Sequence, residues 1–483
     1  MLAGILDLDR DAGLPLPEQI YRKIRAAVGD RRLAADAPLP SSRELSRQLG
    51  VSRNTVNAAY ELLAAEGIIA VRPGARPRVA ELGGLDGAKR ELEEKTRAPQ
   101  VSRRGEGLCR DVRTDAYADP LRRQGRLQPG APAEDCFPRD DWARALRRAA
   151  RHVSGGALLY EDYAGYPPLR RSLAEYLTRE RGVRAKPEQI LILPTTQGCL
   201  HLLAQVLSEP GDCAWLEDPG YLGARAAFAS AGLNIEPLPV DVDGADASGV
   251  ESREPPKLIY VTPSHQYPFG CRMSLDRRLQ LIDRAREAGA LILEDDYDSE
   301  FLFSGRPIAA LQGLGSGDEV IYLGTFAKSM LPGLRIAYMI VPESLAGPIA
   351  IAQRNAGLLG NVHTQAALAD FIESGHYRAH LKRIRETYEA RGRMMVERLR
   401  DGLGNRISVD FPIGGIQLAA RLPPDVDDRA VVKRMVTKGF MLAALSGYGL
   451  KARLNGLVIG FADASEADID AGVKALVEAI GTG

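Results

Sequence analysis

The chain has 483 residues, enough for two or three domains with sizeable cores, and its 26% charged and 45% hydrophobic residues are ordinary for a globular protein. Lys and Arg number 63, as do Asp and Glu, so any nucleic-acid surface must be local. The five cysteines are scattered and form no pairs at the spacing of metal ligands, so we expect reduced thiols and no metal site. We expect no signal peptide at the N-terminus and, since no apolar run reaches about 18 residues, no membrane contact, which makes the cytoplasm the expected location.

The composition along the chain predicts three parts. Residues 1–80 alternate short helical patterns with turn signals, and they carry 12 Lys and Arg against 9 Asp and Glu, a weakly basic balance. Residues 81–125 are polar, mixed in charge and poor in large apolar side chains, which predicts a linker. Residues 126–483 alternate apolar runs with helical stretches, which predicts an α/β domain with a mostly parallel sheet.

The sharpest local pattern is LPSSRELSRQLGVSRNTVNAAYELLAAEG, residues 39–67. Pro40-Ser41-Ser42 followed by Glu44 is an N-cap arrangement that starts a first helix, Gly50 supplies the left-handed residue that ends it, and Ser52 caps a second helix with apolar residues at helical spacing. Two short helices joined at a glycine predict a helix-turn-helix, whose second helix would enter the major groove of double-stranded DNA. A small helical domain for protein contact is the alternative.

This stretch, with residues 15–28 before it, resembles the GntR-type winged helix domains. The resemblance implies that promoter DNA is contacted by Arg43, Ser52, Arg53 and Thr55. The wing departs from the family pattern, because it reads RPGARPRVA where a Ser- and Gly-rich hairpin is expected. Pro77 lacks a backbone donor, which leaves Arg76 and Arg78 as the wing residues able to reach phosphate.

Continuous apolar runs in the C-terminal part predict strands buried on both faces. The runs are 189–194, 213–220, 257–265, 290–298, 320–328 and 335–342. In parallel sheets, functional groups lie just beyond the carboxyl ends of the strands, and each run ends there in polar residues, Gly or Pro.

A set of reactive side chains stands at these strand ends. Lys328 follows one strand, and because a buried ammonium is costly, a lysine there favours a lowered pKa and a Schiff base with an aldehyde. Asp295 can hold a pyridine nitrogen protonated, and Tyr297 can donate to a phenolate oxygen. Thr325 and Arg335 offer donors for a phosphate. Each alone is more often a solvated rim residue.

Together they resemble the fold-type I aminotransferases, and most closely the domain of GabR-like regulators of the MocR group. The matching stretches are 160–177, 217–221, 262–270, 294–301 and 324–338. With the GntR-like part, the resemblance covers nearly the whole chain. It implies pyridoxal 5'-phosphate (PLP) as the cofactor, held as an aldimine on Lys328, with Asp295, Tyr297, Thr325 and Arg335 in the roles just given.

The resemblance also assigns further residues to the cofactor. Tyr221 would lie against the ring, while Thr196 and Gln197 would serve the phosphate through side-chain or helix N-terminal donors. Tyr160 would reach the phosphate in the neighbouring subunit. A homodimer is therefore implied, with the DNA-binding part of one subunit near the large domain of the other.

Two departures from active aminotransferases are visible. Tyr267 stands where an Asn would contact the phenolate oxygen of the cofactor, and Val458 stands where an Arg would grip the substrate α-carboxylate. Arg225 and Arg453 are nearby but out of register, and they are candidates for binding an effector. Without a carboxylate clamp, efficient turnover of α-amino acids is not expected.

These observations favour a PLP-dependent, effector-responsive transcription regulator, in which an amine or amino acid, or PLP itself, is the signal. It would not be an enzyme, apart from weak residual transamination. One alternative is an active aminotransferase with an autoregulatory DNA-binding part. Another is a DNA-binding protein whose large domain only dimerises.

Overall fold

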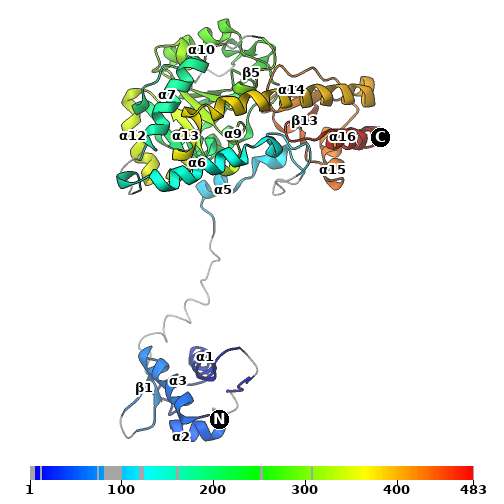
Figure 1. Ribbon diagram of the computed structural model, residues 1–483. Coiled ribbons are helices and arrows are strands. Elements are labelled where there is room, and N and C mark those ends of the chain that lie inside the picture. The colour runs from blue at the N-terminus through cyan, green and yellow to red at the C-terminus, as the bar shows by residue number, and fades with distance from the viewer. Residues whose placement is uncertain are drawn as a thin grey trace. The chain divides into compact units, whose positions relative to one another are not determined.

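The computed structural model describes residues 6–10, 13–72, 75–80, 100–118, 125–158, 163–250, 254–305 and 308–481. The chain forms two compact units, Met1–Gln100 and Val101–Gly483 (Figure 1). Within the described ranges, no helix has both the length and the apolar character needed to cross a membrane.

The first unit is a helical domain with a short hairpin. Its elements are α1 (Leu16–Gly29), α2 (Ser42–Leu49), α3 (Arg53–Ala65), β1 (Ile69–Ala70) and β2 (Arg78–Val79). The two strands are antiparallel, with Ile69 paired to Val79. Ile24, Leu45 and Val56, one from each helix, are fully buried in a common core. The apolar spacing predicted from the sequence therefore holds the three helices together.

The turn between α2 and α3 confirms the predicted helix-turn-helix. The Ser41 hydroxyl accepts a hydrogen bond from the backbone N–H of Glu44 at 3.2 Å, which caps α2. Gly50 ends α2 with φ of 63°, a left-handed conformation that glycine adopts without strain. The Ser52 hydroxyl then accepts from the Thr55 N–H at 3.1 Å and caps α3.

An eight-stranded sheet is the centre of the second unit. Its strands are β3 (Ile190–Leu193), β4 (Cys213–Asp218), β5 (Asn234–Asp241), β6 (Gly244–Ala245), β7 (Leu258–Val261), β8 (Leu291–Asp296), β9 (Val320–Thr325) and β10 (Ala337–Ile340). The order is β3-β10-β9-β8-β7-β4-β5-β6, parallel from β9 to β5, with β10 antiparallel to both neighbours and β6 antiparallel to β5. The predicted α/β fold with a mostly parallel sheet is confirmed.

Helices cover both faces of this sheet. They are α6 (Arg139–His152), α7 (Pro167–Arg181), α8 (Thr196–Leu207), α9 (Leu222–Ala231), α10 (Leu275–Ala288), α11 (Leu311–Leu314), α12 (Glu343–Asn355) and α13 (Val362–Glu373). α8, α9 and α12 share a core with one face, while α7, α10, α11 and α13 pack on the other. The central strands are buried on both sides, which explains their continuous apolar sequences.

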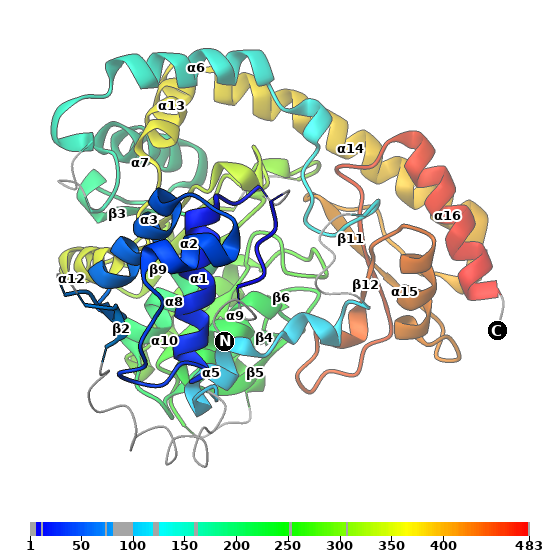
Figure 2. The same ribbon diagram turned by 90° about the horizontal axis from the view of Figure 1, so that it is seen from below.

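A smaller lobe completes the second unit. It holds an antiparallel sheet of β11 (Gln417–Arg421), β13 (Gly456–Gly460) and β12 (Ala443–Ala444), in that order. Helices α14 (His376–Leu403), α15 (Asp428–Thr437) and α16 (Glu466–Gly481) share its core. Figure 2 shows this lobe beside the large sheet, with α14 running alongside α16.

The structure corrects the expected end of the linker. The residues from Val101 on belong to the second unit, where α5 (Arg103–Cys109) packs on α9. After it, η2 (Val112–Asp115) contributes the buried Val112 to a cluster that includes Leu445 and Tyr448. The apolar residues of this segment are too few to reveal its packing from composition. Residues 81–99 and 119–124 of the expected linker lie outside the described residues.

Candidate functional site

A cavity of about 510 Å³ lies where the carboxyl ends of the large sheet's strands meet. Its walls include the residues that follow β3, β4, β7, β8 and β9. Nine of the predicted cofactor residues line it: Thr196, Gln197, Tyr221, Tyr267, Asp295, Tyr297, Thr325, Lys328 and Arg335. The tenth, Tyr160, lies outside the described residues.

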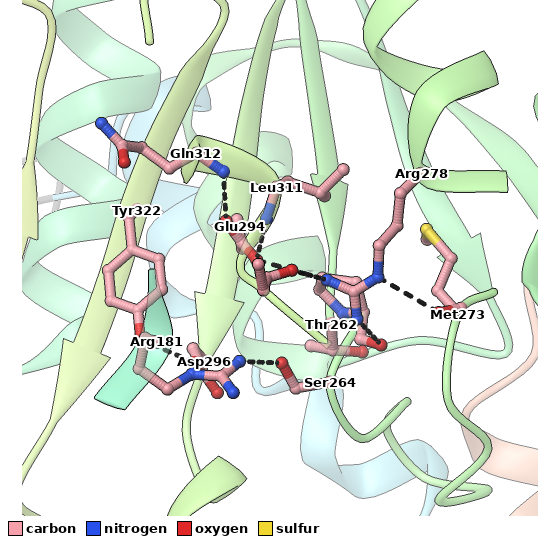
Figure 3. Close-up of polar contacts among 12 residues, drawn as sticks. Arg181, Thr262, Ser264, Met273, Arg278, Glu294, Asp296, Leu311, Gln312 and Tyr322 are labelled. Atoms are coloured by element: carbon pink, nitrogen blue, oxygen red, sulfur yellow. Dashed lines mark hydrogen bonds and ion pairs between the residues drawn. The ribbon is translucent and has the colours of Figure 1, made fainter. Parts of the chain in front are cut away.

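Strand β8 presents Asp295 to the cavity by simple alternation. Its neighbours Glu294 and Asp296 point to the opposite side of the sheet. There the Arg181 guanidinium pairs with Asp296 at 2.8 Å, and the Tyr322 hydroxyl donates to the same carboxylate at 2.6 Å (Figure 3). The strand end is thereby held in place by buried contacts behind the cavity.

Glu294 is fixed in the same way. It accepts hydrogen bonds from the backbone N–H groups of Leu311 at 2.9 Å and Gln312 at 3.0 Å (Figure 3). The fully buried Arg278 lies 3.9 Å from it and donates to the carbonyl oxygens of Pro263 at 2.8 Å and Met273 at 3.1 Å. A second buried cation thus compensates the second carboxylate of the strand.

Asp295 keeps one carboxylate oxygen without a partner. Its Oδ2 accepts from the Tyr260 hydroxyl at 2.6 Å, but its Oδ1 is buried and has no hydrogen-bond partner in the described part of the chain. Burial raises the pKa of Asp295 to about 7, against the opposing effect of Tyr260. An unpaired buried oxygen of this kind fits a donor from a ligand, such as a pyridinium N–H.

Lys328 enters the cavity from the loop after β9. Its Nζ donates to the carbonyl oxygen of Gly130 at 2.6 Å. Burial lowers the pKa of Lys328, while the carboxylates of Asp298 and Asp295 oppose that change. A lysine whose ammonium form is destabilised is readily deprotonated, and the neutral amine is the nucleophile that a Schiff base requires.

The cavity also has an anion-binding wall. The helix α8 begins there at Thr196, with the Thr195 hydroxyl accepting from the Gly198 N–H at 3.0 Å, so the helix N-terminus offers backbone donors. Arg335 lines the same cavity and adopts a left-handed conformation, with φ of 55°. The Gln197 side chain instead donates to the Gly223 carbonyl at 2.9 Å. A phosphate is therefore served by the helix terminus and Arg335, and the site as a whole fits PLP.

Tyrosines form a continuous wall across the cavity. Tyr267 lies edge-on to Tyr221 and Tyr297, with ring centroids 5.5 and 6.0 Å apart. Its hydroxyl is 3.3 Å from that of Tyr448, which in turn donates to Tyr117 at 3.3 Å. Tyr117 and Tyr448 were not predicted from the sequence. Tyr117 stood in the expected linker, and Tyr448 follows no apolar strand run.

The predicted effector residues lie elsewhere. Arg225 and Arg453 are not among the cavity-lining residues; Arg225 pairs with Asp115 at 3.5 Å, and Arg453 is exposed. Val458 is buried in β13, opposite Ala419 and Ala443, and it offers no charge. The cavity instead contains Arg113.

The helix-turn-helix presents two exposed arginines. Arg43 on α2 and Arg53 at the start of α3 are both exposed, and Arg53 donates a long 3.4 Å hydrogen bond to the Ser42 hydroxyl. The hydroxyls of Ser52 and Thr55 are 2.8 Å apart and hold the start of α3. Both of these belong to the cap, so of the four residues predicted to contact DNA, the two arginines are the ones with exposed charged side chains.

The wing arginines have acidic partners. Arg76 pairs with Glu44 at 3.4 Å and Arg78 pairs with Asp36 at 2.6 Å. Exposed pairs of this kind contribute little stability and can open. The phosphate contacts expected of Arg76 and Arg78 would therefore require them to leave these carboxylates.

Comparison with known proteins agrees with both units. Residues 16–79 match the family of bacterial regulatory proteins of the gntR family, and residues 129–476 match aminotransferase class I and II. The chain is 38% identical over 473 residues, 98% of its length and 95% of the relative, to a Rhizobium meliloti protein named "Probable rhizopine catabolism regulatory protein MocR". It is 31% identical to the HTH-type pyridoxine biosynthesis transcriptional regulator PdxR of Corynebacterium glutamicum, covering 93% of each chain.

One of the solved structures similar to this chain is an aminotransferase. LysN, the alpha-aminoadipate aminotransferase of Thermus thermophilus crystallised with N-(5'-phosphopyridoxyl)-L-leucine, superposes with a TM-score of 0.71 at 27% identity. The match covers 79% of this chain and 97% of LysN. The chain therefore belongs to the family of MocR-type transcription regulators, which join a gntR-family helix-turn-helix domain to an aminotransferase class I and II domain.

Proposed function

We propose that this regulator holds PLP in the cavity of its second unit and changes its DNA binding when an amine effector, or PLP itself, occupies that cavity. The observation that carries the proposal is the buried, unpartnered Oδ1 of Asp295 in the same cavity as Lys328. PLP, when bound, supplies an aldehyde that reacts reversibly with amines. Lys328 would hold it covalently, Asp295 would hold its ring nitrogen protonated, and Arg335 with the N-terminus of α8 would bind its phosphate.

The cavity supports sensing rather than efficient turnover. A bidentate guanidinium clamp for an α-carboxylate would project from the position of Val458, which is apolar and buried. Tyr267 replaces a small amide side chain with an aromatic ring in contact with Tyr221 and Tyr297. A ligand amine can therefore approach Lys328, but it is not gripped in the orientation that rapid proton transfer requires.

Aminotransferase activity is the second candidate. The presence of both Lys328 and Asp295 in the cavity favours it, as does the structural similarity to LysN. It requires another group to bind the substrate carboxylate, and Arg113 is the candidate in the cavity.

Dimerisation would place two helix-turn-helix units on one DNA. A single unit with a weakly basic balance should bind weakly, whereas two linked units gain from their effective concentration on a repeated site. We propose that effector binding changes the way in which the two units are held. The DNA-contacting residues would be Arg43 and Arg53, with Ser52 and Thr55 supporting the start of α3.

The test measures DNA and amine binding in one experiment. Full-length protein loaded with PLP is titrated onto fluorescent DNA from upstream of its own gene, with and without a panel of primary amines, while visible absorbance reports displacement of Lys328. We expect an amine that changes the absorbance to change the DNA affinity as well. Protein freed of PLP serves as the control, and it should not respond to the amine. Equal DNA affinity with and without every amine that changes the absorbance, and with and without PLP, would refute the proposal.

A further inference from the structure

The cavity contains a second unsatisfied group, the side-chain amide of Gln417. This residue opens β11, where it pairs with Gly460 of β13, and its side chain is only 3% exposed. Neither the Oε1 nor the Nε2 atom has a hydrogen-bond partner in the described part of the chain, although both are buried. Gln417 nevertheless lines the cavity that holds Lys328 and Asp295.

A buried amide without hydrogen-bond partners lowers the stability of the folded protein. Leaving a buried donor or acceptor without a partner costs about 1–3 kcal/mol, and native structures contain few such groups. Replacement by leucine would remove that cost without loss of packing, so the amide is not explained by stability. Its position in a cavity wall fits a role in binding a ligand.

The neighbours of Gln417 extend this wall with uncharged donors. Burial and the neighbouring Tyr117 phenol raise the pKa of Tyr267, whereas hydrogen-bonding contacts with Tyr448 and with the Gln417 side chain oppose the rise. The Gln417 amide therefore lies beside the Tyr267 hydroxyl, although it does not reach it in normal hydrogen-bond geometry. That hydroxyl continues to Tyr448 and Tyr117 at 3.3 Å for each step. Three phenols and one amide therefore face the cavity together, near the apolar Val458.

We propose that Gln417, with Tyr267 and Tyr448, binds the far end of the effector, and that this end is an uncharged hydroxyl or amide rather than a carboxylate. The proposal rests on the proposed function, because it concerns an amine that reacts at Lys328. A carboxylate only accepts hydrogen bonds, so it could satisfy Nε2 but would leave Oε1 without a donor. A hydroxyl or a primary amide both donates and accepts, and it can satisfy both atoms. This holds whichever way the amide is turned.

The charges of the cavity agree with this assignment. Lys328 and Arg335 belong to the cofactor, and the buried Val458, which shares a cluster with Tyr448, offers no charge. Arg113 and Arg110 line the cavity, together with the opposite charge of Asp111. The Arg113 guanidinium lies over the ring of Tyr117, 4.9 Å from its centroid, and a carboxylate ligand would have to reach it there.

The experiment uses pairs of amines of equal size. PLP-loaded full-length protein is titrated with β-alaninamide against β-alanine, and with 3-aminopropan-1-ol against butylamine, then with the same pairs one and two carbons longer. The dissociation constant is read from the visible absorbance as the amine displaces Lys328. We expect the amide and the hydroxyl members to bind on the order of tenfold more tightly than their isosteres, as expected for one additional satisfied buried group.

Two variants test the residue itself. Gln417→Leu should retain bound PLP, melt no lower than the wild type, and bind butylamine unchanged while losing the tenfold preference for the hydroxyl. Gln417→Met has a similar length without the amide. If leucine disturbs the strand, the methionine variant should lose the preference for the hydroxyl in the same way. Gln48, an exposed residue of the first unit, supplies the control Gln48→Leu, which should retain the preference.

The outcomes separate the two proposals. If no amine changes the absorbance, amine sensing itself is wrong. If amines displace Lys328 but the isosteres bind equally, or the Gln417 variants keep the preference, only the assignment of Gln417 is overturned. Tighter binding of β-alanine than of β-alaninamide would also overturn it, and would assign the far end of the effector to Arg113.

Discussion

Asp295 should destabilise the folded protein when PLP is absent and strengthen PLP binding when the cofactor is present. In the cofactor-free protein its carboxyl has a pKa of about 7, because burial disfavours the ionised form more than the hydrogen bond from Tyr260 favours it. The usual value is near 4, and at about 1.4 kcal/mol per pH unit the difference amounts to about 4 kcal/mol. Since the folded state binds this proton more tightly than the unfolded chain, stability from this group falls as pH rises from about 4 to 7, and stays low above pH 7.

Asp295→Asn should therefore stabilise the cofactor-free protein at pH 8. The amide removes the buried charge, but its Nδ2 would lack a partner at a cost of about 1–3 kcal/mol, which leaves a net gain of about 1–3 kcal/mol. At pH 5 the wild-type carboxyl is already protonated, so the gain should disappear. PLP affinity should fall roughly 10- to 150-fold, because a charge-assisted hydrogen bond of about 1.5–3 kcal/mol is lost.

Thermal melting of the cofactor-free proteins at pH 5 and 8 measures the first effect, and equilibrium dialysis of PLP the second. Asp296→Asn is the matched control on the same strand. It leaves Arg181 buried without its charged partner and should destabilise the protein by about 3–5 kcal/mol at pH 8. The reasoning would be refuted if Asp295→Asn lowered the melting temperature at pH 8 in the absence of PLP, or bound PLP as tightly as the wild type.

Three further predictions concern the cofactor, the DNA and catalysis. Lys328→Ala should lose the visible absorbance of bound PLP after dialysis, while its melting profile persists. The control Lys186→Ala, at an exposed lysine paired with Glu343, should keep the PLP absorbance. Absorbance retained in the Lys328 variant would mean that another lysine binds PLP. In an anisotropy titration, Arg53→Ala should weaken binding to upstream DNA by at least about 1 kcal/mol, roughly fivefold. Arg22→Ala removes an equal charge from α1 and should have a much smaller effect. Equal losses of affinity in the two variants would mean that only net charge matters. Because Val458 offers no clamp, transamination of common α-amino acids in a coupled assay should be far slower than the ~10 s⁻¹ typical of enzymes, and a rate near that value would establish the protein as an aminotransferase.

The sequence predicted the centre of the fold well, because its signals are local. Each of the six apolar runs contains a strand, the predicted cap arrangement at residues 40–44 starts α2, and Gly50 and Ser52 end α2 and cap α3 as expected. Strand β5 was not predicted, since Pro237 and Pro239 interrupt its apolar pattern. It tolerates them near the edge of the sheet, where β5 lies between β4 and the two-residue edge strand β6.

The cofactor end of the cavity was predicted more fully than the effector end. Asp295 lies near the end of β8 and Lys328 follows β9, both in recognisable motifs, and the strand order brings them together. Arg225 was a candidate to replace the missing carboxylate clamp, but on α9 it pairs with Asp115. Gln417 could not be distinguished from a core residue, because its significance lies in the hydrogen bonds that it lacks.

The segment that carries Arg113 and Tyr117 has a consequence for signalling. Along the chain it follows residues 81–99, which join the two units, and it forms part of the cavity wall. Along the chain, the DNA-binding unit is therefore connected to the wall of the cavity, and under the proposed function a ligand that moves Tyr117 would act on this connection. Thermodynamic linkage is reciprocal, so if the amine alters DNA affinity by some factor, promoter DNA must alter amine affinity by the same factor. A regulator built in this way would sense its metabolite differently on the promoter than free in solution.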